Sequence, residues 1–293
     1  MKIGTHALIW AGGWSKAEAE ETISGAAALG YDFVELALAD PDAVDVPHTR
    51  ALLEQHGIGC TCGLGLPADA HLPAAPEAAE AFLGRALEVA AALGAPILTG
   101  GVYTHLGART GAPPRPDELE RIGEVLGRVA QRAAALGMQL GIENINRYES
   151  YLATTMDQVL GLIDRIGEPN VVAHFDTYHA NIEERGFAAP VMAAGERLGY
   201  VHISESDRGV IGTANVRFDD VFAALATIGY DGPLVIESFS PRTPEVINAF
   251  ALWRDPVGDP VHFSRRSLEV VRTMLERHGL STSATPARAD ASH

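Results

Sequence analysis

Eight short apolar runs alternate with longer stretches of helical periodicity along nearly the whole chain. The runs predict strands over Lys2–Ile9, Phe33–Leu38, Gly57–Gly63, Pro96–Gly100, Gln139–Ile145, Val171–Phe175, Tyr200–Ile203 and Leu234–Ile236. The stretches between them, such as Pro76–Leu93 and Pro116–Leu136, predict helices. Such regular strand–helix alternation disfavours a β-sandwich and indicates parallel strands joined by crossover helices.

Several predicted helices are followed by a glycine just before the next strand, namely Gly30, Gly57, Gly94, Gly137 and Gly229. Glycine adopts the left-handed conformation that ends a helix. The 293 residues accommodate a (β/α)8 barrel, which needs about 250 residues. No G-x-G-x-x-G motif follows the first strand, which disfavours a dinucleotide-binding sheet. We therefore predict one α/β domain, a (β/α)8 TIM barrel over residues 1–280, and a disordered tail over 281–293, where periodicity is lost.

Charge and composition disfavour several classes of partner. The net charge is −16, and no cluster of five or six basic residues is present, which argues against a nucleic-acid partner. No apolar run reaches the roughly 18 residues of a membrane-spanning helix, so no membrane partner is predicted. The N-terminus leads directly into the first strand without the features of a signal peptide, which predicts a cytoplasmic protein. Cys60 and Cys62 would face the same side of one strand and make a poor disulfide, which agrees with a reducing compartment.

The last four predicted strands each end on an ionisable residue inside an apolar segment. The segments GIENIN, AHFDTYH, VHISES and VIESF contain Glu143, Asp176, His202 and Glu237. Such groups are seldom buried unless they are paired or bound to a metal. In a barrel these strand ends converge, and three crowded carboxylates repel one another unless a cation or protons compensate. Three carboxylates and one imidazole, without a thiolate, predict a divalent cation of the Mn²⁺, Mg²⁺ or Co²⁺ type rather than structural zinc.

Taken singly, the same residues have ordinary structural explanations. These are ion pairs of Glu143 with Arg147 and of Glu237 with Arg242, helix capping by Asp176, and a hydrogen-bonded core position for His202. Further polar residues follow at short offsets, namely Glu149, His179 and Arg208. They fall in the loops above the predicted barrel, where they could contact a substrate or simply be solvated charges.

In order and offset, these seven positions resemble the pattern of the ketose 3-epimerases, which include the D-tagatose, D-allulose (D-psicose) and L-ribulose 3-epimerases of the xylose isomerase-like barrels. The resemblance is densest from Gln139 to Phe239, in the segments ENINRYESYLATT, HFDTYHANIEE, HISESDRGVIGTANVRFDDVFAAL and IESFS. It implies one divalent metal per subunit, Mn²⁺ in the first place and Co²⁺ or Mg²⁺ as alternatives, with Glu143, Asp176, His202 and Glu237 as ligands. It also implies that Glu143 and Glu237 form the acid–base pair.

The resemblance further implies that Glu149, His179 and Arg208 bind the O1–O3 end of a sugar, and that Trp14 and Phe239 line its far end. Two departures concern that far end. His6 stands where many members carry Phe or Tyr, and TGGVYTHLGART lacks a Trp, so that Tyr103 or His105 could take its place. The implied function is epimerisation of a free ketose at C3 through a cis-enediolate, by a homodimer or homotetramer.

Three other functions fit parts of the pattern. An aldose–ketose or hydroxypyruvate-type isomerase would use a similar metal site but move a proton between C1 and C2. A DNA-repair endonuclease of related fold would need more histidines, for several zinc ions, and a basic face for DNA. A sugar-binding protein without activity would have lost an acid–base carboxylate, whereas Glu143 and Glu237 are both present.

Overall fold

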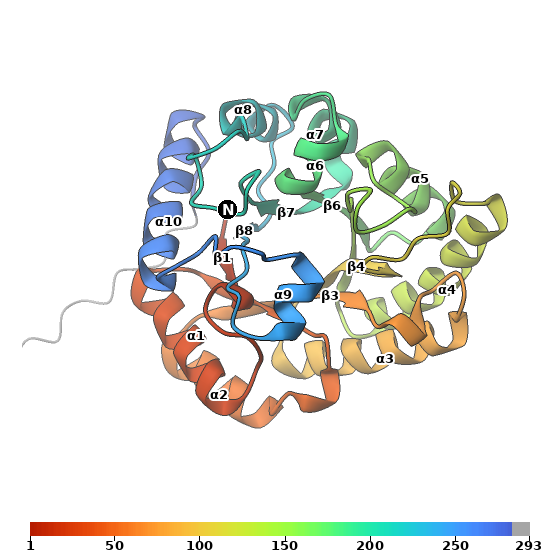
Figure 1. Ribbon diagram of the computed structural model, residues 1–293, viewed down its shortest axis with the longest axis horizontal. Helices are drawn as coiled ribbons and strands as arrows, with labels where there is room; N and C mark the ends of the chain where they lie inside the picture. Colours follow the sequence, from red (N-terminus) through yellow and green to blue (C-terminus); the bar gives the residue numbers. More distant parts are fainter. Residues whose placement is uncertain (283–293) are drawn as a thin grey trace, which may run out of the picture.

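The computed structural model describes residues 1–282, and within them eight parallel strands close into a barrel in sequence order. The strands are β1 (Ile3–His6), β2 (Phe33–Ala37), β3 (Gly59–Leu66), β4 (Ile97–His105), β5 (Gln139–Glu143), β6 (Val171–Asp176), β7 (Leu198–Ile203) and β8 (Leu234–Ile236). Pairing of β1 with β8, in which Ile3 lies opposite Leu234, closes the barrel. Helices surround the strands on the outside (Figure 1). The predicted (β/α)8 barrel is confirmed.

The helices follow the predicted alternation. They are α1 (Lys16–Leu29), α2 (Val46–His56), α3 (Pro76–Leu93), α4 (Pro116–Ala135), α5 (Met156–Ile166), α6 (Thr177–Glu183), α7 (Ala188–Ala194), α8 (Phe218–Thr227), α9 (Pro244–Phe250) and α10 (Pro260–Arg277). Short 3-10 turns cover Ala7–Ile9, Pro41–Ala43, Ala68–Ala70 and Gly195–Arg197. All five glycines predicted to follow helices have positive φ, between +67° and +83°. Their left-handed conformation ends each helix and turns the chain toward the next strand.

The fourth strand is longer than predicted, since it runs from Ile97 to His105 rather than ending at Gly100. Gly100 has a φ of +105°, and a Cβ there would lie 2.5 Å from the carbonyl oxygen of Leu64 on β3. Only glycine permits this close approach of two strands. The strand therefore continues through Gly100 and Gly101, and the residues beyond them, up to His105, belong to the barrel wall.

The interior of the barrel is apolar at the amino ends of the strands. Phe33, Ile97, Val172 and Val235 come from β2, β4, β6 and β8 and form one buried cluster with Tyr200 of β7. Side chains contributed by alternate strands make up one layer of a TIM-barrel interior. This layer, named here the amino-end layer, fills the floor beneath the site described below.

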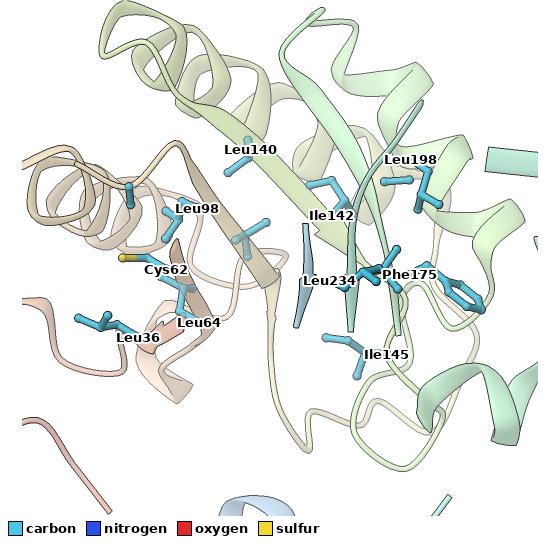
Figure 2. Packing of buried hydrophobic residues seen from close by; sticks show 14 of the residues in the cluster. Leu36, Cys62, Leu64, Leu98, Leu140, Ile142, Ile145, Phe175, Leu198 and Leu234 are labelled. Atoms are coloured by element: carbon cyan, nitrogen blue, oxygen red, sulfur yellow. The ribbon is translucent and has the colours of Figure 1, made fainter. Parts of the chain in front are cut away.

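The main hydrophobic core lies between the barrel and its helices. Strand residues that alternate with the interior positions pack into it, including Leu36, Cys62, Leu98, Leu140 and Ile142 (Figure 2). Cys60 and Cys62 are both buried, and both are free cysteines. Among residues 1–282, none of the helices combines the length and apolar character that crossing a membrane requires.

The N-terminal amine of Met1 donates a hydrogen bond to the carbonyl oxygen of Ser281 at 2.7 Å, so the first residue of the predicted tail is held against the barrel. The rest of that prediction falls almost entirely on residues 283–293, which lie outside the described part of the chain.

Candidate active site and metal centre

Interior positions that are apolar at the amino ends of the strands become polar toward the carboxyl ends. Two residues further along the same strands, the inward positions are occupied by Glu35 on β2, Thr99 on β4 and His174 on β6, and by Glu237 just after β8. On β7, His202 stands two residues beyond Tyr200 in the same way. Because side chains two apart on a strand share a face, all of these point into the barrel. The strand pattern therefore concentrates ionisable groups at one end of the interior.

The Nδ1 atom of His202 is the point at which the three predicted carboxylates meet. It lies 3.4 Å from Glu143 Oε1, 3.4 Å from Asp176 Oδ2 and 3.1 Å from Glu237 Oε1. All four residues are buried. The structure thus brings together the four residues that were predicted as metal ligands.

Two atoms of this cluster show that a divalent cation fits there. Asp176 Oδ2 and His202 Nδ1 are buried, and neither makes a hydrogen bond to any residue of the described chain. An unpartnered buried polar atom is costly, and three carboxylates with an imidazole form an oxygen-rich donor set suited to a hard or borderline divalent cation. The ligand atoms of Asp176, His202 and Glu237 lie within 4.8 Å of one another and could hold such an ion. Glu143 belongs to two overlapping groups, one with His174 and His202 and one with Asp176 and His179.

The ordinary structural explanations hold for Asp176 and, at one ring nitrogen, for His202, whose Nε2 lies 2.9 Å from Glu35 Oε2. Asp176 Oδ1 accepts hydrogen bonds from the backbone N–H groups of Tyr178 and His179 and caps α6, while Oδ2 faces the cluster. Arg147 pairs with Glu183 at 2.8 Å rather than with Glu143. The partner of Glu237 is Arg208 rather than Arg242. One aspartate can therefore cap a helix and still present a free oxygen to the site.

The electrostatic environment separates the two carboxyl groups of the predicted acid–base pair. Burial raises the pKa of Glu143 to about 7, against the opposing influence of His202 and His179. Burial would also raise the pKa of Glu237, but the nearby His202 and Arg208 hold it well below its usual value. Burial likewise disfavours charge on His202, yet Glu237 and Glu35 raise its pKa well above the usual value. Two carboxyl groups with different proton affinities are typical of an acid–base pair.

Arg208 is held over the cluster by a strained loop. Its φ of +62° lies in the left-handed region that non-glycine residues rarely adopt. Its guanidinium lies 3.7 Å from the ring centre of Tyr178 and 4.7 Å from that of Phe239, and it donates to Ser204 Oγ at 2.8 Å. Backbone strain of this kind persists only where the surroundings impose it, and it is concentrated at functional sites.

The loop that carries Arg208 folds around a buried carboxylate. Glu205 is fully buried, and its side chain accepts hydrogen bonds from four backbone N–H groups, those of Ser206, Gly212, Ala214 and Val216. The backbone N–H of Arg208 in turn donates to the carbonyl oxygen of Glu205 at 3.0 Å. These bonds organise the segment after β7 and fix the position from which Arg208 reaches the site.

His179 and Glu149 are oriented by a shared neighbour, Asn146. The Asn146 side-chain amide lies 2.8 Å from Glu149 Oε1 and 2.8 Å from His179 Nδ1. The backbone N–H of Asn146 also donates to His179 Nδ1, at 3.2 Å, so this nitrogen acts as an acceptor. The proton of the ring therefore sits on Nε2, which lies 3.9 Å from Glu143 Oε1.

A cavity of about 790 Å³ opens above the cluster at the carboxyl end of the barrel. Its walls include every predicted substrate-binding residue: His6, Trp14, Glu149, His179, Arg208 and Phe239. Helix α9 contributes Glu245, Val246, Ala249 and Phe250, and it lies across this end of the barrel (Figure 1). Phe239 stacks on Phe250, with 3.7 Å between ring centres, which joins the wall to this helix.

At the far end of the cavity, the structure distinguishes between the two residues that could replace the missing Trp. Tyr103 is fully buried in the wall, and its hydroxyl donates to the backbone oxygens of Glu143 and Ala153. His105 lines the cavity, and its Nδ1 lies 3.1 Å from the carbonyl oxygen of Leu66. His6 also lines it, and its Nδ1 accepts from the Leu8 N–H at 3.3 Å. Of Tyr103 and His105, only His105 is placed to meet a ligand.

Three residues close to the site were missed by sequence reasoning: Glu35, His174 and Asn146. Glu35 bonds to His202, and His174 packs edge-to-face on His202, with 4.1 Å between ring centres. The signal was present for Glu35 and His174, since each interrupts an apolar strand in the same way as the predicted ligands do. Asn146 gave no such signal, because a polar residue after a strand is ordinary loop composition.

Comparisons with known proteins agree with this geometry. Residues 23–258 match the family described as xylose isomerase-like TIM barrel. The chain is 40% identical over 278 residues to an L-ribulose 3-epimerase of Methylomonas sp., covering 93% of this chain and 97% of that protein. It is 36% identical to a ketose 3-epimerase of Arthrobacter globiformis, covering 94% and 97% respectively.

Solved structures give the same result. A D-allulose 3-epimerase from Methylomonas sp., in complex with D-allulose, superposes with a TM-score of 0.90 at 39% identity, covering 94% of this chain and 97% of that one. A second structure, of an L-ribulose 3-epimerase, superposes with a TM-score of 0.90 at 31% identity, covering 95% of each chain. The chain belongs to the xylose isomerase-like TIM barrels and, within them, to the ketose 3-epimerase family of isomerases.

Proposed function

We propose that this protein inverts the configuration of a free ketose at C3, with Glu143 and Glu237 as the acid–base pair and one divalent metal per subunit. The observation that carries the proposal is the meeting of Glu143, Asp176 and Glu237 at His202 Nδ1 beneath a cavity of sugar-binding size. The relatives named above act on L-ribulose and on D-allulose, which makes these two ketoses the first candidates.

The placement of the two glutamates supports inversion. Glu143 ends β5 and Glu237 follows β8, and these strands are not neighbours in the barrel. Carboxyl groups on separate strands can reach opposite faces of a flat carbon centre. One glutamate would remove the C3 proton next to the C2 carbonyl, and the other would return a proton to the opposite face of the enediolate.

The remaining residues would bind and orient the sugar. His179 Nε2–H and the Arg208 guanidinium are donors for the oxygens at the C1–C3 end, and Glu149 is an acceptor for a hydroxyl there. Trp14, Phe239 and His6 would line the C4–C6 end. A divalent cation, when bound by Glu143, Asp176, His202 and Glu237, supplies positive charge that offsets the negative charge developing on the sugar oxygens.

The charge of the cavity favours a neutral sugar over a sugar phosphate. Arg208 is the single Arg or Lys among the described residues that line it, and Arg208 is already paired with Glu237. The same walls contain Glu35, Asp40, Glu149 and Glu245 in addition to the catalytic pair. A phosphate group would meet net negative charge without a free cationic partner, which disfavours its binding.

Solvent-exchange NMR tests the proposal directly. Mn²⁺-loaded protein is incubated in D₂O with L-ribulose, D-allulose, D-fructose and D-tagatose in separate reactions, and the sugars are separated from the metal before spectra are recorded. We expect deuterium at C3 and a ketose of inverted C3 configuration. Deuterium at C1 together with an aldose would instead identify the aldose–ketose isomerase, and absence of exchange on every sugar would contradict both activities.

Three further properties stay predictions of this proposal. They are Mn²⁺ as the metal in the cell, assembly as a homodimer or homotetramer, and a cytoplasmic location. The two free buried cysteines agree with a reducing compartment. Metal analysis of purified protein, light scattering and cell fractionation test them in turn.

A further inference from the structure

Glu35 is a buried carboxylate that the proposed chemistry does not use. It lies in the middle of β2, faces the barrel interior and is 1% exposed. Its Oε2 accepts a hydrogen bond from the Tyr200 hydroxyl at 2.5 Å and lies 2.9 Å from His202 Nε2. Its Oε1 lies 3.9 Å from His6 Nε2. A buried charge is retained only where its partners repay the loss of water, so this arrangement needs an explanation.

The surrounding chain is built to accommodate this carboxylate. Gly63 on β3 faces Glu35, and a Cβ at that position would overlap Glu35 Oε1. The Tyr200 hydroxyl that donates to Glu35 also lies 2.6 Å from Thr61 Oγ1, two residues before Gly63 on the same strand. Three strands, β2, β3 and β7, thus hold the side chain of Glu35 in one place.

The bond between Glu35 and His202 determines which nitrogen of the imidazole faces the carboxylate cluster. An ionised carboxylate can only accept hydrogen bonds, so the proton in this contact belongs to His202 Nε2. The opposite nitrogen, Nδ1, is then the atom that meets Glu143, Asp176 and Glu237. A histidine that binds a metal through one nitrogen commonly donates its other N–H to a carboxylate, which fixes the ring and raises its basicity.

We propose that Glu35 is a positioning residue for the metal centre, which holds the His202 ring so that Nδ1 points at the cation. The inference rests on the proposed metal site and adds to it a residue that contacts neither the cation nor the reacting carbon. On this proposal Gly63, Thr61 and Tyr200, which surround Glu35, affect metal affinity as well as packing.

Metal titration of the apoprotein is the test, because it does not depend on turnover. Metal-free wild type and Glu35→Gln, which fills the same space without the charge, are titrated with MnCl₂ in a calorimeter. We expect Glu35→Gln to weaken Mn²⁺ binding by about 10- to 100-fold. Glu118→Gln is the matched control, since Glu118 is also a buried carboxylate that accepts from a tyrosine, Tyr151, at 2.8 Å, but lies on α4 away from the cluster. We expect this control to bind Mn²⁺ as the wild type does.

A second variant changes the position of Glu35 and leaves its charge intact. In Gly63→Ala the added methyl group displaces the carboxylate, and we expect Mn²⁺ affinity to fall in the same direction as in Glu35→Gln. Proton NMR of the Co²⁺-loaded proteins gives a second readout, because we expect the His202 Nε2–H of the wild type to give a shifted, exchangeable proton signal. We expect that signal to move or disappear in both variants and to persist in Glu118→Gln.

The outcomes separate this inference from the proposed function. Wild-type affinity and an unchanged Co²⁺ proton signal in Glu35→Gln and Gly63→Ala, both folded by near-ultraviolet circular dichroism, would overturn the role of Glu35 and leave the metal centre intact. Failure of the wild type itself to bind Mn²⁺ or Co²⁺ would overturn the metal centre, and the role of Glu35 with it.

Discussion

The barrel interior is apolar at the amino ends of the strands and polar at their carboxyl ends, although the same strands supply both sets of side chains. The amino-end layer consists of Phe33, Ile97, Val172 and Val235, from β2, β4, β6 and β8. Two residues further along the chain, the next inward positions carry Glu35, Thr99, His174 and Glu237, of which Glu237 lies just past the end of β8. The first set packs as a hydrophobic cluster, and the second is connected by hydrogen bonds or faces the carboxylate cluster. A shift of two residues along a strand therefore separates stability from chemistry.

The two layers contribute to the stability of the fold with opposite signs. Burying an apolar side chain stabilises the fold by about 1.5–3 kcal/mol. Burying carboxylates close together destabilises it unless protons, cations or donors compensate. The carboxyl end can hold its crowded charges because the amino end and the outer helices supply the stability.

The largest expected effect follows from removing the proposed cation at the carboxyl end of the barrel. Exhaustive chelation followed by buffer exchange should abolish epimerisation, and added Mn²⁺ or Co²⁺ should restore it, because the negative charge that develops on the sugar oxygens then lacks a cation to offset it. Product formation is measured by NMR alongside the metal content of the same sample. Full activity in protein shown to be free of metal would contradict the proposal that the carboxylate cluster works with a bound cation.

Next in size is the loss of one carboxylate of the proposed acid–base pair. Glu237→Gln removes the proposed proton carrier that follows β8, and we expect kcat to fall by about 10²- to 10⁴-fold at saturating Mn²⁺. Glu118→Gln, in a buried carboxylate outside the cavity, serves as the control and should retain wild-type kcat. A Glu237→Gln variant with wild-type turnover would overturn the two-carboxylate mechanism.

Truncation in the amino-end layer should affect stability rather than chemistry. Phe33→Ala removes a ring that packs with Ile97, Val172 and Val235, and we expect the free energy of unfolding to fall by about 3–5 kcal/mol. Urea denaturation measures this change, and calorimetric titration of the folded variant should give wild-type Mn²⁺ affinity. If the affinity fell together with the stability, the two layers would not be the separate units described above.

The smallest effect concerns the boundary between the two layers. Thr99 Oγ1 lies 2.9 Å from His174 Nδ1, and both residues are fully buried. Thr99→Val keeps the shape but leaves that nitrogen without its partner, so we expect a loss of about 1–3 kcal/mol in the free energy of unfolding. Thermal and urea denaturation check this, and a variant as stable as the wild type would show that the hydrogen bond contributes nothing there.

Much of the site could be predicted from the sequence because its four principal residues interrupt apolar strands. Glu143, Asp176, His202 and Glu237 each stand where a buried strand would otherwise continue, and parallel strands of a barrel bring such ends together. Glu35 interrupts FVELA in the same way, yet its partners Tyr200 and His202 are more than 160 residues away in the chain. Nothing local indicates that these side chains meet.

The backbone of the fourth strand also could not be predicted in full from the local sequence. Two glycines in succession, Gly100 and Gly101, are typical of a strand end or a turn, and the predicted strand stopped there. The structure continues the strand because neighbouring β3 approaches too closely for any Cβ at Gly100. The requirement for glycine came from a contact between strands, which the sequence of either strand alone does not contain.

The sequence by itself determined the barrel, its order of strands and the presence of four ionisable residues at strand ends, because periodicity and spacing are local properties. Only the tertiary structure decided which atoms of those residues meet. That His202 presents Nδ1 to the carboxylates and Nε2 to Glu35, that Asp176 divides its oxygens between a helix cap and the cluster, and that Tyr103 turns away from the cavity all depend on contacts across the barrel. Side-chain orientation is set by packing from several strands at once, and it therefore appears only when the chain is folded.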